Sequence, residues 1–182
     1  MNSSGKKNLK WYIAALAGFL VLVALDQWTK YLAVLHLKEQ PDIEIIPGVF
    51  KLHYLENRGA AFGILQNQQW IFILLCAVFL VLITWLYLRL PKTKHYLPFA
   101  VLAVGISAGA AGNLIDRIRL NYVVDFLYAS FIDFPVFNVA DIYVTVSVIL
   151  LALCILFFYK DDEDYSFLKK DGKQNGNISS SH

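Results

Sequence analysis

Four long apolar runs alternate with polar stretches along the chain. They cover residues 11–28, 69–88, 96–115 and 139–159. Each run is close to the roughly 20 residues with which an α-helix crosses a bilayer. The pattern predicts a mainly α membrane protein, with four transmembrane helices in a single integral membrane domain over residues 1–160.

Three stretches outside these runs have patterns of their own. Residues 40–58 include IEIIPGVFKLHYLEN, in which β-favouring residues flank the turn signal Pro47-Gly48, so we predict a small β-sheet there. The connection 117–138 is long enough to fold back and to form a short helix at the membrane surface. Residues 161–182 are charged and then rich in Gly, Asn and Ser, and we expect this tail to be disordered.

Basic residues indicate the orientation in the membrane. Three lysines precede the first run, and the short loop of residues 89–95 holds three Lys or Arg. The long stretch of residues 30–68 holds only four. Lys and Arg are enriched on the cytoplasmic side of membrane proteins. We therefore expect both termini and the tail in the cytoplasm, and the β-sheet and the connection 117–138 outside it.

The composition excludes several classes of function. Hydrophobic residues make up 58% of the 182 residues and charged residues only 16%, whereas about a quarter is charged in soluble domains. A net charge of +2 gives no basis for a nucleic-acid partner. Cys76 and Cys154 lie inside apolar runs, and no Cys or His pair has metal-ligand spacing, so we predict no disulfide, metal or other cofactor.

Two carboxylates have a basic neighbour in the sequence. Asp26 stands one helical turn before Lys30, on the same face of the predicted first helix, and Asp116 is followed directly by Arg117. A cation beside a carboxylate stabilises its charge, which suits a structural ion pair. We therefore expect Asp26 and Asp116 to form local ion pairs that support the structure.

Asp125 and Asp141 lack such neighbours, with no basic residue within four positions on either side. Both are flanked by apolar residues at the membrane edge, where a carboxylate is costly and is by default functional. Asp133 also lacks a basic neighbour, but it lies beside Pro135 in the connection, where we expect it to be solvated. If the connection folds back, Asp125 and Asp141 can share one proton, and one then acts as a base and the other as an acid.

These residues leave more than one function open. A carboxyl pair can activate a water for amide hydrolysis, and it can also serve as a proton relay in a small transporter. A transporter favours polar residues near the middle of its spans, whereas Asp125 and Asp141 lie at the ends of runs. A non-catalytic binder of lipidated peptides, or a scaffold in which the aspartates only bind neighbouring helices, are further alternatives.

Five short motifs give the chain a family resemblance. They are LDQWTK at 25–30, NRGAAFG at 57–63, AGNLIDRI at 111–118, VVDFL at 123–127 and FNVAD at 137–141. In this order, on a four-span chain, they resemble bacterial lipoprotein signal peptidase, also called signal peptidase II. The resemblance implies an intramembrane aspartic endopeptidase of the bacterial inner membrane, with its active site at the outer face.

The resemblance also implies the substrate and the roles of residues. Its substrates would be prolipoproteins, cleaved on the amino side of a diacylglyceryl-modified cysteine, and its partners would be membrane lipid and the cyclic peptide inhibitor globomycin. Asp125 and Asp141 would be the catalytic pair. The sheet would form a cradle on the membrane, and residues 126–136 would cover the pair as a lid. The residues expected to bind substrate or support the site are Asp26, Lys30, Asn57, Gly59, Asn113, Asp116, Arg117 and Asn138.

Overall fold

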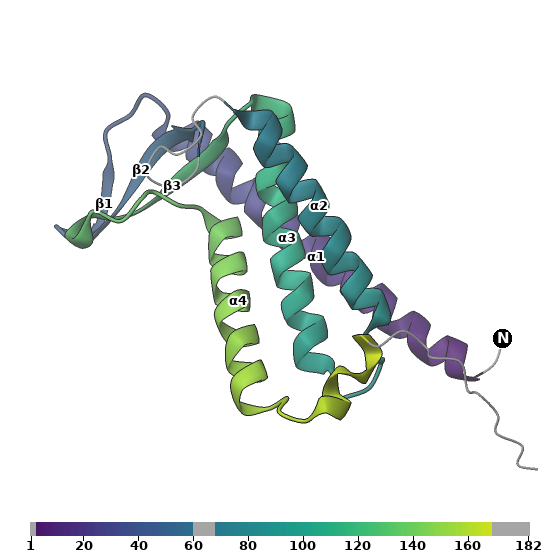
Figure 1. Ribbon diagram of the computed structural model, residues 1–182. Coiled ribbons are helices and arrows are strands. Elements are labelled where there is room, and N and C mark those ends of the chain that lie inside the picture. The colour runs from purple at the N-terminus through teal and green to yellow at the C-terminus, as the bar shows by residue number, and fades with distance from the viewer. Residues whose placement is uncertain (1–2, 60–67, 169–182) are drawn as a thin grey trace, which may run out of the picture.

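The structure is a computed structural model that describes residues 3–59 and 68–168. Its helices are α1 (Ser3–Leu37), α2 (Gln69–Arg89), α3 (Leu97–Leu120) and α4 (Val139–Phe157), and its strands are β1 (Ile43–Ile46), β2 (Phe50–Asn57) and β3 (Val123–Ala129). Two 3₁₀ helices, η2 (Ser130–Ile132) and η3 (Asp162–Leu168), complete the described elements. The mainly helical fold with a small sheet confirms the predicted class (Figure 1).

Each of the four α-helices contains a segment long and apolar enough to cross a membrane. Two of them extend beyond the predicted spans, because α1 continues to Leu37 and α3 continues to Leu120. The apolar pattern of both runs fades at the charged residues Asp26, Lys30 and Asp116, but these three are buried against one another inside the bundle. The C-terminal ends of α1 and α3 therefore lie beyond the ends of the apolar runs.

Helix α3 lies at the centre of the bundle and packs against the other three helices (Figure 1). Small residues allow this close approach. A Cβ atom added at Gly109 would collide with the backbone oxygen of Ala140 on α4, and one added at Gly112 would collide with the carboxylate of Asp26 on α1. Glycine at these positions thus brings α1 and α4 onto α3, and with them the polar residues that they carry.

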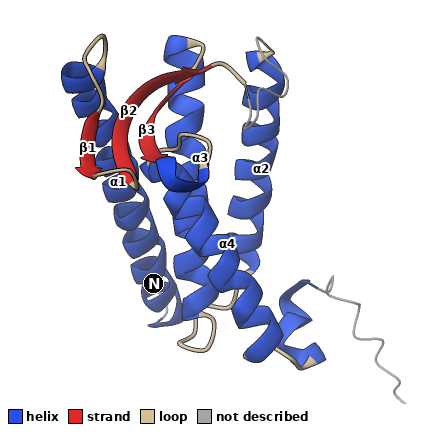
Figure 2. Cartoon of the chain, turned by 90° about the vertical axis from the view of Figure 1, so that its left-hand side faces the viewer, coloured by secondary structure: helices blue, strands red, loops and turns tan. Residues whose placement is uncertain are grey.

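The sheet lies at one end of the bundle and has the antiparallel order β1-β2-β3 (Figure 2). Strands β1 and β2 fall in the predicted segment, but β3 does not. It comes from the connection 117–138, where the sequence predicts a short helix; past the end of α3 at Leu120, the helical part of that connection is only the 3₁₀ turn η2. The residues of β3, VVDFLYA, are mostly β-branched or aromatic, and they pair with β2 so that Asp125 lies opposite Leu55.

The chain beyond α4 folds back at the end of the bundle opposite the sheet (Figure 1). Here η3 packs its Phe167 on Tyr96, and the hydroxyl of Tyr165 donates to the backbone oxygen of Tyr159 at 2.8 Å. The expectation of disorder over residues 161–182 is therefore wrong for residues 161–168, because aromatic side chains dock this stretch on the bundle. Residues 169–182 lie outside the described part of the chain.

Candidate active site

Asp125 and Asp141 line the same cleft, which has a volume of about 490 Å³. Asp125 is on β3 and is 2% exposed, and Asp141 is in the first turn of α4. The two residues meet because the chain reverses after β3 and returns beside it, where Phe137 forms an antiparallel bridge with Leu127. The remaining residues that line the cleft are Asn57, Gly59, Arg117, Phe134, Pro135, Val136, Phe137, Ile142, Thr145 and Val146.

Asn138 contacts both aspartates. It is the N-cap of α4, where its side chain accepts from the nitrogen of Asp141 at 3.1 Å, and its own nitrogen donates to Oδ2 of Asp141 at 3.0 Å. This reciprocal capping box fixes the Asp141 side chain at the start of the helix. The Nδ2 of Asn138 also donates to Oδ1 of Asp125 at 2.6 Å. One fully buried residue therefore sets the relative position of the two carboxyls.

Two further amides complete the hydrogen bonds of the pair. Asn113 on α3 donates through Nδ2 to Oδ1 of Asp141 at 2.8 Å, and Asn57 at the end of β2 donates through Nδ2 to Oδ2 of Asp125 at 2.8 Å. The Oδ1 of Asn113 accepts from Lys30 at 2.9 Å, so its amide nitrogen is turned toward Asp141. Each of the four carboxyl oxygens therefore accepts a hydrogen bond from an amide N–H.

The surroundings of the two carboxyls differ in charge preference. Burial, together with the nearby charge of Asp141, raises the pKa of Asp125 to about 7. Asp141 instead lies in the N-terminal turn of α4, where the helix dipole and the backbone N–H groups favour a negative charge. Asp125 therefore begins to lose its proton only near neutral pH.

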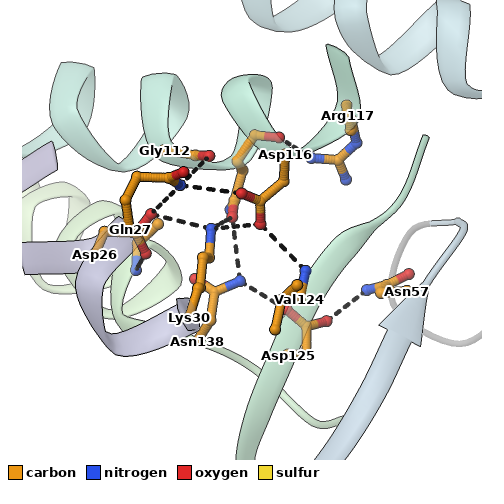
Figure 3. A network of polar contacts seen from close by, with 12 residues as sticks. Asp26, Gln27, Lys30, Asn57, Gly112, Asp116, Arg117, Val124, Asp125 and Asn138 are labelled. Carbon is orange, nitrogen blue, oxygen red and sulfur yellow. Dashed lines mark hydrogen bonds and ion pairs between the residues drawn. The ribbon is translucent and has the colours of Figure 1, made fainter. Parts of the chain in front are cut away.

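A second buried network lies behind the pair, and Lys30 is its centre (Figure 3). Its Nζ atom lies 3.0 Å from Oδ2 of Asp26 and 3.0 Å from Oδ2 of Asp116. The ion pair predicted between Asp26 and Lys30 is present. The pair predicted between Asp116 and Arg117 is wrong, because the side chain of Asp116 points toward α1 and binds Lys30. Adjacent residues on a helix point in different directions, so neighbours in sequence are poor guides to pairs.

This network reaches the backbone beside each cleft aspartate. The Oδ2 of Asp116 accepts from the nitrogen of Val124 at 3.1 Å, and the Oδ1 of Asp26 accepts from the nitrogen of Ala140 at 3.0 Å. Val124 precedes Asp125, and Ala140 precedes Asp141. Lys30 thus joins two carboxylates that each hold the residue immediately before one member of the pair.

Gln27 belongs to this network, and sequence reasoning missed it. Its Nε2 lies 3.0 Å from Oδ1 of Asp116, 3.1 Å from Oδ2 of Asp26 and 3.2 Å from the backbone oxygen of Gly112. A polar amide between Asp26 and Lys30 within an apolar span was the available signal. The side chain adds donors where two buried carboxylates share one cation.

Arg117 and Gly59 also lie at the cleft. The guanidinium of Arg117 donates to the backbone oxygen of Asn113 at 3.3 Å and lies 4.9 Å from the ring of Phe72, while its Nε has no hydrogen-bond partner among the described residues. The nitrogen of Gly59 donates to Oδ1 of Asn57 at 3.0 Å, which turns the Asn57 amide nitrogen toward Asp125. The small residues from 60 to 63 lie outside the described part of the chain.

Asp133 lies apart from this cleft, in an exposed position where the hydroxyl of Tyr128 donates to its carboxylate. The predicted site residues instead gather around Asp125 and Asp141 from α1, β2, α3 and the start of α4. Together, the four membrane-length helices and the two carboxyls in one cleft define a multi-pass membrane protein with a candidate site at one end of its bundle.

Comparison with known proteins gives the family. The family model of signal peptidase (SPase) II matches residues 18–157. The lipoprotein signal peptidase of Streptococcus thermophilus is 43% identical over 150 residues, which cover 82% of this chain and 95% of that protein. The lipoprotein signal peptidase of Streptococcus pyogenes serotype M5 is 42% identical over 146 residues, which cover 80% and 92%.

Two solved structures, both described as bacterial membrane enzymes, share the fold. One is 29% identical with a TM-score of 0.69, and the match covers 88% of this chain and 93% of that one. The other is 31% identical with a TM-score of 0.68, and the match covers 80% and 94%. The chain therefore belongs to the signal peptidase II family, and it is a peptidase of the bacterial inner membrane. This confirms the resemblance seen in the motifs and favours a hydrolase over the transporter and the binding protein.

Proposed function

We propose that this peptidase removes signal peptides from prolipoproteins, on the amino side of a diacylglyceryl-modified cysteine, with Asp125 and Asp141 as its catalytic aspartates. Family membership supports the substrate class. The observation that carries the mechanism is the placement of both carboxyls in one cleft, bridged by Asn138 and differing in their preference for charge.

In this mechanism Asp141 is the base and Asp125 is the acid. A water held between them transfers a proton to Asp141 as its oxygen bonds to the scissile carbonyl carbon, and Asp125 gives its proton to the carbonyl oxygen. In the second step Asp141 passes its proton to the leaving amide nitrogen, and the C–N bond breaks. A hydroxyl proton of the tetrahedral intermediate then returns to Asp125, so the pair ends in its starting state.

The cleft suits a substrate that is part peptide and part lipid. Beside the carboxyls its walls are apolar, with Phe134 and Phe137 from the returning segment and Ile142 and Val146 from α4. Such walls accept acyl chains from the bilayer while the scissile bond stays beside the acids. We propose that membrane lipid and the inhibitor globomycin also contact this cleft, and that residues 134–137, rather than the whole of 126–136, cover the bound substrate.

The orientation follows the distribution of basic residues. The sheet lies at one end of the bundle, and the start of α1 and η3 lie at the other (Figures 1 and 2). The cleft is at the sheet end, because Asp125 on β3 lines it. Arg89 ends α2, and Lys92 and Lys94 lie in the loop that joins α2 to α3, at the end away from the sheet. The positive-inside rule then puts both termini in the cytoplasm and the cleft at the outer face.

The test is cleavage of a purified prolipoprotein by the purified protein in detergent. Two forms of the same substrate are compared, one with the diacylglyceryl group on the cysteine and one with the free thiol. We expect cleavage of the modified form only, and block of that cleavage by globomycin. Equal cleavage of both forms, or none of either by folded protein, would overturn the proposed substrate.

A further inference from the structure

Phe137 lies beside β3 in an isolated antiparallel bridge with Leu127. The nitrogen of Phe137 donates to the oxygen of Leu127 at 2.9 Å, and the nitrogen of Leu127 donates back to the oxygen of Phe137 at 2.8 Å. The nitrogen of Phe126 shares the Phe137 oxygen at 3.0 Å. These bonds make Phe137 the one ladder position of an incomplete fourth strand, which the chain leaves at Asn138 to enter α4.

Val136, the residue before Phe137, directs its backbone N–H and C=O groups away from β3. Successive residues of an extended chain direct their N–H and C=O groups to opposite edges, so the groups of Val136 point away from β3. No backbone hydrogen bond links Val136 to another residue in the described part of the chain. Pro135 has no N–H, and the nitrogen of Asn138 is bound to Asp141. Val136 therefore offers one donor and one acceptor at an unpaired sheet edge.

This edge opens on the cleft that holds the carboxyl pair. Val136 lines the same cavity as Asp125 and Asp141. Beyond Asn138 the chain turns away into α4, and no strand within residues 3–59 and 68–168 continues the edge past that point. An added strand that pairs with Val136 can run on toward the carboxyl pair in the same cavity, at a rise of ~3.3 Å per residue.

We propose that the substrate binds here as an added β-strand, with its backbone paired to Val136. The N–H of Val136 donates to a substrate carbonyl, and the carbonyl of Val136 accepts from a substrate N–H. This inference rests on the proposed function and specifies how the prolipoprotein is held. The extended form also exposes the scissile amide, which a helix would keep in its own hydrogen bonds.

The direction of the cleft assigns the pairing with Val136 to the substrate residues that follow the modified cysteine. From Asp141 the cleft continues along α4 past Thr145 and Val146, away from the sheet. An apolar signal peptide fits along that helix face. The part of the substrate that follows the cleavage point must then leave on the sheet side, beside Val136.

The first test replaces single amides of the substrate by esters, which removes one N–H at a time. A modified prolipoprotein peptide is varied from three residues before to four residues after the cysteine, with the scissile amide kept, and assayed with the unaltered enzyme. We expect one position, within three residues after the cysteine, at which the ester raises KM about 5- to 10-fold, as expected for one lost hydrogen bond. Failure of the all-amide peptide would contradict the proposed function itself.

With the all-amide peptide cleaved, a scan without any sensitive position would overturn the strand pairing, and a sensitive position before the cysteine would overturn its direction. A second test compares Val136→Pro, which removes the donor and keeps an extended conformation, with Val136→Leu, which keeps the donor. We expect KM for Val136→Pro to exceed that for Val136→Leu by about fivefold at similar kcat. Equal KM values in two folded variants would also overturn the pairing, and the ester scan decides if Val136→Pro does not fold.

Discussion

The carboxylate of Asp116 accepts a hydrogen bond from the backbone nitrogen of Val124 at 3.1 Å, and thereby holds the residue that precedes Asp125. Asp26 does the same for Ala140, which precedes Asp141. Lys30 binds both carboxylates from the centre of the bundle. The two halves of the cleft, one on a strand and one on a helix, are therefore fixed to a common buried cation.

Replacing Lys30 by methionine should strongly destabilise the fold. The change leaves the buried carboxylates of Asp26 and Asp116 facing each other without a cation, and breaking such a pair costs about 3–5 kcal/mol. Thermal unfolding in detergent measures the loss. The matched control is Lys51→Met, which removes an exposed pair with Asp42 on the sheet and should change stability little. Equal effects of the two substitutions would show that the buried network is not the stabilising element.

Replacing Gln27 by leucine should destabilise the fold less than the loss of Lys30. The leucine keeps the size of the side chain but removes the amide that contacts Asp26, Asp116 and the Gly112 oxygen. Leaving buried acceptors without this donor costs about 1–3 kcal/mol. The free energy of unfolding, measured at one pH for wild type and variant, gives the difference. A free energy of unfolding for Gln27→Leu equal to that of wild type would show that Gln27 does not stabilise the network.

Stability should fall as the pH rises from about 4 to about 7, because of Asp125. Its pKa is raised from 3.8 to about 7 in the folded state, so below pH 4 both folded and unfolded states hold the proton. Between these values the unfolded state releases the proton while the folded state keeps it, which favours unfolding, and above about 7 the effect is constant. The full effect is on the order of 4 kcal/mol.

Asparagine at position 125 cannot ionise, so Asp125→Asn should lack this contribution. The melting temperatures of wild type and variant are compared across the pH range. The melting temperature of the variant minus that of wild type should increase from pH 4 to 7 and then stay constant. A gap independent of pH would mean that folding does not raise the pKa of Asp125.

Gly109→Ala should separate α4 from α3 and reduce activity. The added Cβ would collide with the backbone oxygen of Ala140 and would lie 2.7 Å from Cγ2 of Val144, so α4 must shift together with Asp141. Gly18→Ala is the matched control, because its Cβ would lie 3.7 Å from Val104, an ordinary contact. We expect loss of activity and stability for Gly109→Ala, and wild-type or higher stability for Gly18→Ala. The same melting temperature for both would contradict tight packing at Gly109.

Much of the fold could be predicted from the pattern of apolar residues alone. Long apolar runs have one stable form in lipid, so the four helices follow directly. Strand β3 did not follow, because its residues lie in a segment whose return beside β2 depends on tertiary pairing. The docking of η3 through Tyr165 and Phe167 likewise depends on partners far away in the sequence.

The site was predictable to a different degree. Asp125 and Asp141 stood out because they lack charged neighbours, and the structure brings them to one cleft. The ion-pair partner predicted for Asp116 was wrong, because its actual partner, Lys30, comes from a helix and lies 86 residues earlier in the chain. Gln27 gave a signal only as a polar amide within an apolar span, and Val136 gave none, because their roles rest on a side-chain orientation and on a backbone direction that only the fold defines.

The most direct test of the catalytic pair compares single-turnover cleavage of the modified prolipoprotein by wild type, Asp125→Asn and Asp141→Asn. Asp133→Asn serves as the control, because Asp133 is exposed and lies outside the cleft. Each variant is checked for folding by its melting temperature and for globomycin binding. We predict that both cleft variants lose at least 1,000-fold in rate, on the order expected when an essential acid or base is removed, while Asp133→Asn cleaves like wild type. Cleavage within about tenfold of wild type by either folded cleft variant would contradict the two-aspartate mechanism.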